Sequence, residues 1–157
     1  MTFRILPLPL APFQPLFALD DEALFAIGAR RMIADAPNSA PCRVSLTDAP
    51  VGEGLLLVNH SHLTHPASPY RATGPIFVGE TAVEADLEPG VVPDMVSRRL
   101  LSVRVYDTDW MMIDADVVEG ADLHGRLTTW FADPGVEDIQ IHTARRGCYL
   151  ARAVRAD

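Results

Sequence analysis

The sequence contains no lysine, only two cysteines and no long run of hydrophobic residues. All 13 basic side chains are arginines, and 21 acidic residues leave a formal net charge of -8. The chain therefore lacks the basic surface of a general nucleic-acid-binding protein. Its longest apolar runs, such as residues 55–58, are far shorter than the roughly 18 residues that a membrane span requires. These absences predict a soluble protein that binds neither nucleic acid nor a membrane.

The apolar N-terminus raises the question of a secretion signal. Prolines interrupt it, and no small-residue cleavage motif closes a continuous apolar core, so we expect mature sequence in a cytoplasmic protein. Cys42 and Cys148 are then expected to lie in a reducing compartment, where a stable disulfide is the exception. Each thiol is therefore a core atom, a ligand or a reactive group.

The length of 157 residues, 48% of them hydrophobic, is sufficient for one domain spanning residues 1–157 without a disulfide or a structural metal. Residues 1–16 form a proline-rich arm, because each proline ring fixes φ and removes a backbone donor. The prolines match the PxxP pattern of docking peptides. The leucines and the phenylalanine between them favour an arm that packs on its own domain.

Two main helices are predicted, over residues 20–34 and 121–132, with a shorter one over 93–99. The first begins with three consecutive acids, which suit the free backbone donors of a first turn, and continues with apolar residues at helical spacing. The second has apolar residues at i, i+4, i+7 and i+8 and ends before Pro134.

Eight further segments have strand character, and three of them alternate clearly between apolar and polar residues. They are residues 3–6, 42–46, 55–59, 75–79, 100–106, 111–118, 136–142 and 148–154. Many short strands with two separated helices predict an α+β fold: a single domain with a mostly antiparallel sheet and the two main helices packed on one face.

The fifth and sixth predicted strands are expected to form a hairpin, because only a few residues with turn character separate them. The favoured register pairs Tyr106 with Met112 and Arg104 with Asp114. It directs every apolar side chain to the core, whereas the alternative register places an acid among apolar side chains, which is costly.

Three histidines, His60, His62 and His65, lie close together in the chain. Imidazoles at i and i+2 with a third nearby are a partial zinc site, and their spacing resembles the HxHxDH element of metallo-β-lactamase-like hydrolases. The acid of that element is missing, and no Asp, Glu or Cys lies within four residues. We therefore expect solvated loop histidines and no bound metal, with a metal-dependent enzyme as the weaker alternative.

An arginine lies near each cysteine, and a histidine lies near the second. Arg43 follows Cys42, and His142 and Arg145 precede Cys148. Guanidinium groups and an imidazole stabilise a thiolate, the reactive form of cysteine, so His142 and Cys148 are the candidate catalytic residues. Burial as a small hydrophobic residue is the alternative for each thiol, and it is favoured for Cys42.

Several arginines lie in turns or on polar strand faces, and guanidinium forks bind carboxylate or phosphate groups bidentately. The predicted ligand-binding residues are Arg43, Tyr70, Arg71, Arg104, Asp114 and Arg145. Internal pairing with the 21 acidic residues is the alternative for any single arginine. A site requires several of them to converge, and we expect Arg43, Arg71, His142 and Cys148 to line one cleft.

Four short motifs occur in a fixed order: PCRVSL at 41–46, SPYR at 68–71, RRLLSVR at 98–104 and HTARRGCY at 142–149. In this order they resemble a bacterial family known as domain of unknown function twelve hundred and three. The resemblance spans nearly the whole chain. It implies a small single domain and no particular activity, substrate or cofactor.

The resemblance also marks individual positions. The family pattern matches at Cys42, Arg43, Tyr70, Arg71, Arg104, His142, Gly147 and Cys148. His62 lies where a family histidine is expected, whereas His60 and His65 depart from the pattern. The family favours Asn where this chain has Thr143, which weakens a role that needs an amide there.

Three functions remain open from the sequence. The first is a protein that binds a small molecule or an anion in an Arg/Tyr/His/Cys pocket, with or without enzymatic activity. The second is a non-catalytic interaction module, for example a homodimer. The third is the metal-dependent enzyme. No cofactor is predicted.

Overall fold

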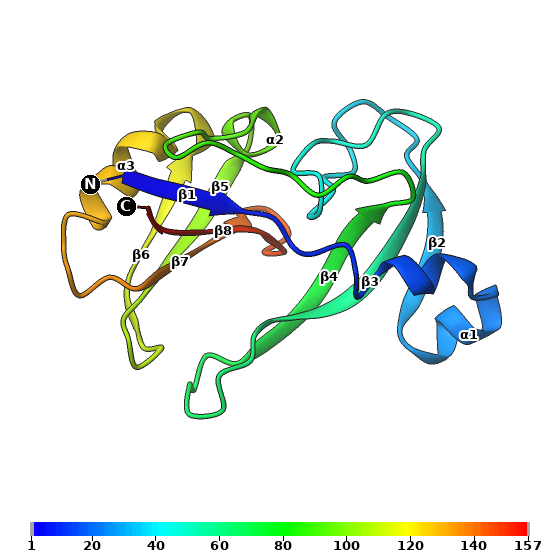
Figure 1. Cartoon of the computed structure of the whole chain (residues 1–157), viewed down its shortest axis with the longest axis horizontal. Coiled ribbons are helices and arrows are strands. Elements are labelled where there is room, and N and C mark those ends of the chain that lie inside the picture. Colours follow the sequence, from blue (N-terminus) through cyan, green and yellow to red (C-terminus); the bar gives the residue numbers. More distant parts are fainter. Residues whose placement is uncertain (1, 157) are drawn as a thin grey trace.

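The computed structural model describes residues 2–156, whose strands form two antiparallel sheets (Figure 1). The five-stranded sheet has the order β1 (Thr2–Leu6), β8 (Tyr149–Ala156), β7 (Asp138–Thr143), β5 (Leu100–Tyr106), β6 (Met112–Glu119). The three-stranded sheet has the order β2 (Ala29–Ile33), β3 (Gly54–Leu63), β4 (Ala72–Gly79). The helices are short: η1 (Gln14–Ala18), α1 (Asp21–Ala26), α2 (Asp94–Ser97), η2 (Gly120–Asp122) and α3 (Leu123–Trp130). The expected antiparallel arrangement is confirmed, with the strands divided between two sheets.

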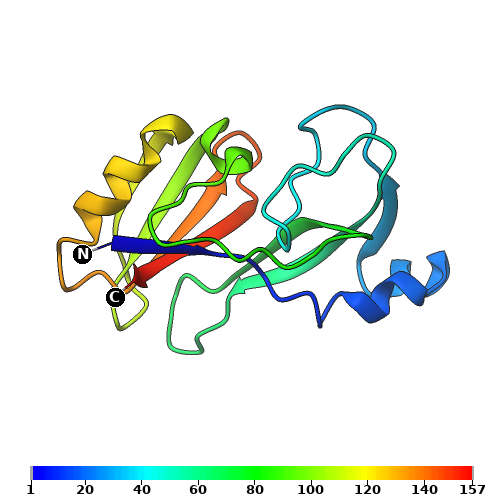
Figure 2. The ribbon, with the colours of Figure 1, turned by 45° about the horizontal axis from the view of Figure 1, so that its top comes forward.

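Each sheet has its own hydrophobic core. Helix α3 covers one face of the five-stranded sheet (Figure 2). Its Leu123 and Leu127 belong to the same buried core cluster as Val103 and Ile139. Helix α1 instead lies against β2, at the opposite end of the molecule (Figure 1). The N-terminal arm crosses from one sheet to the other, and Phe13 joins the core of the smaller sheet. The two sheets are thus separate layers, joined where β4 contacts β8.

The helix expected over residues 20–34 is wrong beyond residue 26. Its start is correct, because the Asp20 side chain accepts a hydrogen bond from the Ala23 N–H at 2.8 Å. Gly28 then adopts a φ of +74°, a left-handed conformation that suits glycine and ends the helix. The following residues pair with β3 as strand β2. Tertiary strand pairing therefore overrides the helical spacing of the apolar residues.

The strand expected over residues 42–46 is also wrong. This segment forms turns, with one isolated bridge between Cys42 and Phe77 and a left-handed Leu46. The other seven expected strands are present, and β3 extends to Leu63. The irregular path of residues 42–46 places Arg43 between the two sheets.

The predicted register of the β5–β6 hairpin is correct at Tyr106 and Met112 but wrong beyond that pair. A β-bulge at Ile113 shifts the strand by one residue, so that Arg104 lies opposite Ala115.

The shift places Asp114 on the face that α3 covers, where it accepts a hydrogen bond from Trp130 Nε1 at 2.7 Å. The acid is tolerated there because β6 is an edge strand, Asp114 is exposed and the indole supplies a donor. The expected pairing of Arg104 with Asp114 is therefore not formed.

Candidate functional site

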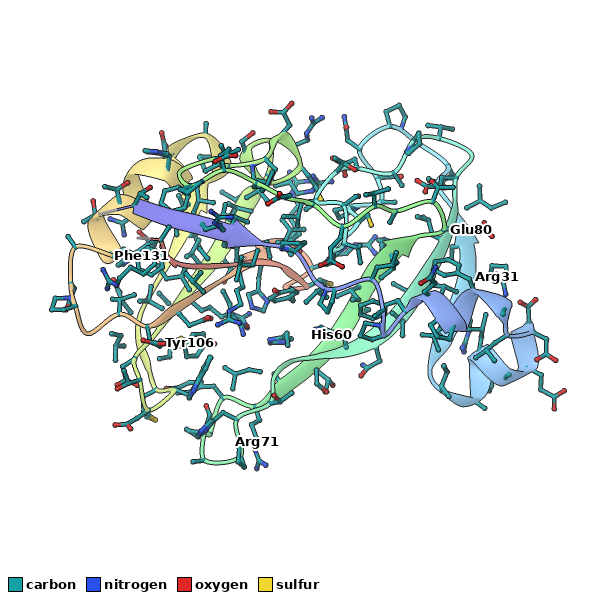
Figure 3. The ribbon with its side chains drawn as sticks, viewed as in Figure 1. Arg31, His60, Arg71, Glu80, Tyr106 and Phe131 are labelled. Atoms are coloured by element: carbon teal, nitrogen blue, oxygen red, sulfur yellow. The ribbon has the colours of Figure 1, made fainter. Side chains whose placement is uncertain are left out.

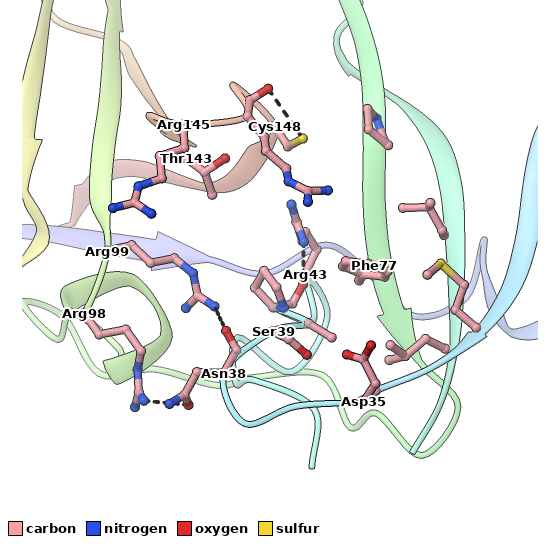
Figure 4. A pocket seen from close by; sticks show the side chains of 18 of the residues that line it. Asp35, Asn38, Ser39, Arg43, Phe77, Arg98, Arg99, Thr143, Arg145 and Cys148 are labelled. Carbon is pink, nitrogen blue, oxygen red and sulfur yellow. Dashed lines mark hydrogen bonds between the residues drawn. The ribbon is translucent and has the colours of Figure 1, made fainter. Parts of the chain in front are cut away.

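A large cavity lies between the two sheets, next to the turn that joins β7 to β8 (Figure 4). Its volume is about 1060 Å³, at the upper end of the range for small-molecule sites. Five arginines line it: Arg43, Arg98, Arg99, Arg145 and Arg146. We call it the arginine cavity.

Arg43 is the most deeply buried of these arginines, with 3% of its surface exposed. Its backbone N–H donates to the Phe77 carbonyl at 3.1 Å, which ties the loop to β4. Its Nε donates to the Tyr149 carbonyl at 2.8 Å and its Nη1 to the Pro41 carbonyl at 2.5 Å. One backbone carbonyl from the same loop and one from β8 therefore fix the guanidinium plane.

No carboxylate pairs with Arg43 among residues 2–156. Burial lowers the pKa of its guanidinium to about 10, so the group still carries its charge at neutral pH. A buried charge is costly unless an opposite charge or strong hydrogen bonds offset it. Neutral carbonyls offset this one only in part, so the site is electrostatically suited to an anion.

Arg98 and Arg99 line the cavity but are already engaged. Arg99 bonds both carboxylate oxygens of Asp48, and Arg98 Nη1 donates to Asn38 Oδ1 at 2.6 Å. Their segment is fixed by a close backbone approach, since a Cβ on Gly120 would lie 2.4 Å from the Val96 carbonyl oxygen. These two arginines form a rigid wall.

The β7–β8 turn forms the opposite wall and carries Arg145, Arg146 and Cys148. Gly147 has a φ of +74°, and its N–H donates to the Thr143 carbonyl at 2.8 Å, which closes the turn. Neither Arg145 nor Arg146 forms an ion pair in the described chain. Thr143 Oγ1 is buried without a hydrogen-bond partner, which leaves one more polar group at this wall.

The smaller sheet supplies an apolar wall, to which Leu57 and Phe77 contribute (Figure 4). The five arginines of the lining face only two acids, Asp35 and Glu119. The cavity is therefore cationic in a protein whose net charge is -8. A cleft lined mostly by one sign of charge attracts the opposite sign.

His142 and Cys148, the predicted catalytic residues, are not hydrogen-bonded to each other. In the buried His142 ring, Nδ1 lies 3.1 Å from the Gly147 carbonyl and Nε2 lies 3.2 Å from Gln140 Oε1. Both neighbours are acceptors, so a neutral ring donates to only one of them, and neither nitrogen faces Cys148. Burial, reinforced by the charge of Arg104, lowers the pKa of His142 to about 3, so the ring is neutral. The Cys148 thiol instead contacts the Arg146 carbonyl, at 3.9 Å.

The predicted ligand-binding residues separate into several places. Arg43 and Arg145 line the arginine cavity, whereas the other four do not. Tyr70 and Arg71 lie at the tip of the β3–β4 hairpin, where Figure 3 labels Arg71, and neither lines the cavity. Arg104 lies on the face of the five-stranded sheet opposite α3, and Asp114 lines a hollow of about 420 Å³ beside Trp130. Arg71 and His142 therefore do not share the cavity with Arg43 and Cys148.

The three clustered histidines do not form one group, and the expectation of solvated loop histidines is wrong for His60 and His62, whose half-buried rings lie on β3 and both contact Tyr149. His60 contacts the rings of Phe13 and Tyr149, His62 hydrogen-bonds Gln140, and His65 stacks on Trp110. Within residues 2–156, no group of three His, Cys, Asp or Glu side chains is arranged to hold a metal ion.

The sequence reasoning missed several cavity residues, and some of them carried a signal. Arg98 and Arg99 stand inside one of the motifs that marked the family resemblance. The uninterrupted apolar run at residues 55–58 is typical of a strand covered on both faces, which is the position of β3. Thr143 carried no signal, because only the fold shows that its hydroxyl lacks a partner.

Comparisons with known proteins identify a family and nothing more specific. Among the described residues, no helix is both long and apolar enough to span a membrane. No curated protein and no solved structure matches the chain. A family model matches residues 39–155, which include every arginine of the cavity, the β7–β8 turn and the histidines of β3. The chain therefore belongs to the family described as protein of unknown function (DUF1203).

Proposed function

We propose that the protein binds a small organic anion in the arginine cavity. A carboxylate or phosphate group of the ligand is held by Arg43, Arg145 and Arg146, and an apolar body lies against Leu57 and Phe77. The observation that carries the proposal is Arg43, a buried cation held by backbone carbonyls and without a carboxylate partner in the described chain.

The energetics support an anion rather than a neutral ligand. A hydrogen bond to a charged group contributes about 1.5–3 kcal/mol, roughly twice a neutral one, and is strongest where water is excluded. Arg43 is already oriented by two carbonyls, so little side-chain entropy is lost when the anion binds. The exposed Arg145 and Arg146 add long-range attraction and less affinity, because solvent screens them.

The geometry favours binding over covalent catalysis. Cys148 is the thiol at the cavity wall, but no imidazole or carboxylate hydrogen-bonds it within residues 2–156. A nucleophilic thiol needs a base or a strongly stabilised thiolate. Cys42 is the other thiol, and it is buried as an acceptor for the Gly79 N–H at 3.3 Å.

Isothermal titration calorimetry with benzoate, phenyl phosphate and benzyl alcohol tests the proposal. We expect at least one anion to bind and the neutral alcohol not to bind. Arg43→Gln is expected to weaken anion binding about 10- to 100-fold, the equivalent of one charge-assisted hydrogen bond.

Two further variants complete the design. The double variant Arg145→Gln/Arg146→Gln alters only exposed turn residues, so it preserves the fold and is expected to weaken binding several-fold. Arg71→Gln removes an equal charge at the distant hairpin tip and is expected to leave affinity unchanged. Binding of neither anion by the wild-type protein, or equal loss in Arg71→Gln and Arg43→Gln, would overturn the proposal.

A further inference from the structure

A second group of polar residues lies on the face of the five-stranded sheet opposite α3, and it is independent of the arginine cavity. Three of its members form one row across the sheet, since Arg104 on β5 and Arg152 on β8 both pair with Gln140 on β7. Gln140 is buried, and so are Asp138 and His142 before and after it on the same strand. Polar residues in the centre of a sheet need partners, and the β3–β4 hairpin supplies one, His62.

The hydrogen bonds between His62 and Gln140 determine where the imidazole proton lies. Gln140 Nε2 is 2.7 Å from the His62 backbone carbonyl, which accepts hydrogen bonds and never donates, so this atom must be the amide NH₂. The other amide atom, Oε1, is therefore the acceptor that lies 2.8 Å from His62 Nδ1. His62 must donate through Nδ1, and its Nε2 carries the lone pair.

The Nε2 atom of His62 is open to a ligand. His62 is half-buried and stacks on Tyr149 with the two rings at 11°, and no described residue hydrogen-bonds its Nε2. Burial is the main cause that lowers the pKa of His62, and the charge of Arg104 adds to it, so the ring stays neutral at pH 7. The lone pair is thus presented to solvent as a hydrogen-bond acceptor.

Arg104 has no carboxylate partner among residues 2–156, and its side chain interacts instead with the neutral Tyr106 hydroxyl. The bulge at Ile113 turns Asp114 to the opposite face, so β6 supplies no carboxylate to it. Asp138, the carboxylate on the same face, is paired with Arg152. The neutral imidazoles of His62 and His142 do not compensate the charge of Arg104. Gln140 therefore lies between two groups with unused binding capacity. Within the described chain, Arg104 is a cation without a carboxylate partner, and His62 Nε2 is a hydrogen-bond acceptor without a donor.

We infer that Arg104 and His62 form a second ligand site, which binds an oxyanion that carries a hydroxyl group. The anionic oxygen accepts hydrogen bonds from the Arg104 guanidinium, and the hydroxyl donates its hydrogen to His62 Nε2. Inorganic phosphate and hydroxy acids share this combination of groups. A simple carboxylate lacks the donor and places only acceptors against the lone pair of His62.

Glycolate, acetate and inorganic phosphate are the probes that test the inference, because glycolate differs from acetate by one hydroxyl. We first expect ¹H–¹⁵N spectra of the full-length protein to show His62 as the Nδ1–H tautomer. Titration is then expected to shift the His62 ring resonances with glycolate or phosphate at concentrations about three- to tenfold below those needed for acetate, the gain from one net hydrogen bond.

Variants separate this site from the arginine cavity. Arg104→Met is expected to abolish the glycolate and phosphate shifts at His62 while the Nδ1–H tautomer is retained, which also reports that the hairpin is still docked. Arg43→Gln is expected to leave these shifts unchanged, so failure of this site and failure of the proposed function are distinguishable. An Nε2–H tautomer, equal response to glycolate and acetate, or no response to any probe would overturn the inference.

Discussion

Lowering the pH from 7.0 to 5.5 is expected to reduce the free energy of unfolding by about 1.3 kcal/mol through His142 alone. The imidazole is fully buried, and its pKa falls from 6.5 to about 3 in the folded protein, mainly through burial. The unfolded chain therefore binds this proton at a pH where the folded protein does not.

The direction and the size of this loss in the free energy of unfolding follow from the difference between the folded and unfolded pKa values of His142. Because the folded pKa is depressed, the contribution is fully present above pH 6.5, and it is lost progressively as the pH falls toward 3. The whole shift corresponds to a loss on the order of 5 kcal/mol, of which the first portion falls between pH 7.0 and 5.5. His60 and His62 also have lowered pKa values and act in the same direction. Asp138, whose pKa burial raises, acts in the opposite direction.

Urea unfolding followed by tryptophan fluorescence at the two pH values measures the loss, and His142→Asn isolates it. The variant removes this one titration, so its loss between pH 7.0 and 5.5 is expected to be about 1.3 kcal/mol smaller than that of the wild type. The ring resonances of His142 in the folded wild type are expected not to titrate in this range. A His142 resonance that titrates near pH 6.5, or equal pH dependence in the two proteins, refutes the reasoning.

Two further changes act on the walls of the arginine cavity. Gly120→Ala is expected to destabilise the protein by about 1–3 kcal/mol, because its Cβ would clash with the Val96 carbonyl at 2.4 Å; urea unfolding measures the loss, and wild-type stability contradicts the account. Asp48→Ala is expected to cost about 2–4 kcal/mol, because it leaves the partly buried Arg99 without its carboxylate. Thermal unfolding measures that cost, and a change below about 0.5 kcal/mol would show that the pair is only a surface ion pair.

Local patterns in the sequence predict much of this fold. The apolar spacing of 121–132 predicts α3, the alternation of 100–106 predicts β5, and the turn residues between β5 and β6 place Tyr106 opposite Met112. Each of these three features can be predicted from a single segment, because it depends only on the local spacing of apolar, polar and turn residues. The bulge at Ile113 does not, because it depends on a distant donor, Trp130, that satisfies the displaced acid.

The candidate site was predictable in part. Residue chemistry identified Arg43, Arg145 and Cys148, which line one cavity. It also grouped His142 and Arg71 with them, although β7 directs His142 to the buried polar face and the β3–β4 hairpin carries Arg71 away. Which arginines lack a partner depends on long-range contacts such as the pairing of Asp48 with Arg99, and no local pattern contains these contacts.

The rate at which Cys148 reacts with charged and neutral disulfides tests the arginine cavity most directly. Cys148 is partly exposed at the cavity wall and Cys42 is buried, so one thiol is expected to react, and Cys148→Ser controls for this. The anionic aromatic reagent dithiobis-nitrobenzoate is compared with neutral dithiodipyridine, and a short cysteine peptide gives the reference ratio of the two rates. We predict that Cys148 favours the anionic reagent about tenfold more than the peptide does, that benzoate slows its reaction, and that Arg43→Gln reduces the preference. A ratio equal to that of the peptide, unchanged by Arg43→Gln and by benzoate, would contradict an anion site at Arg43.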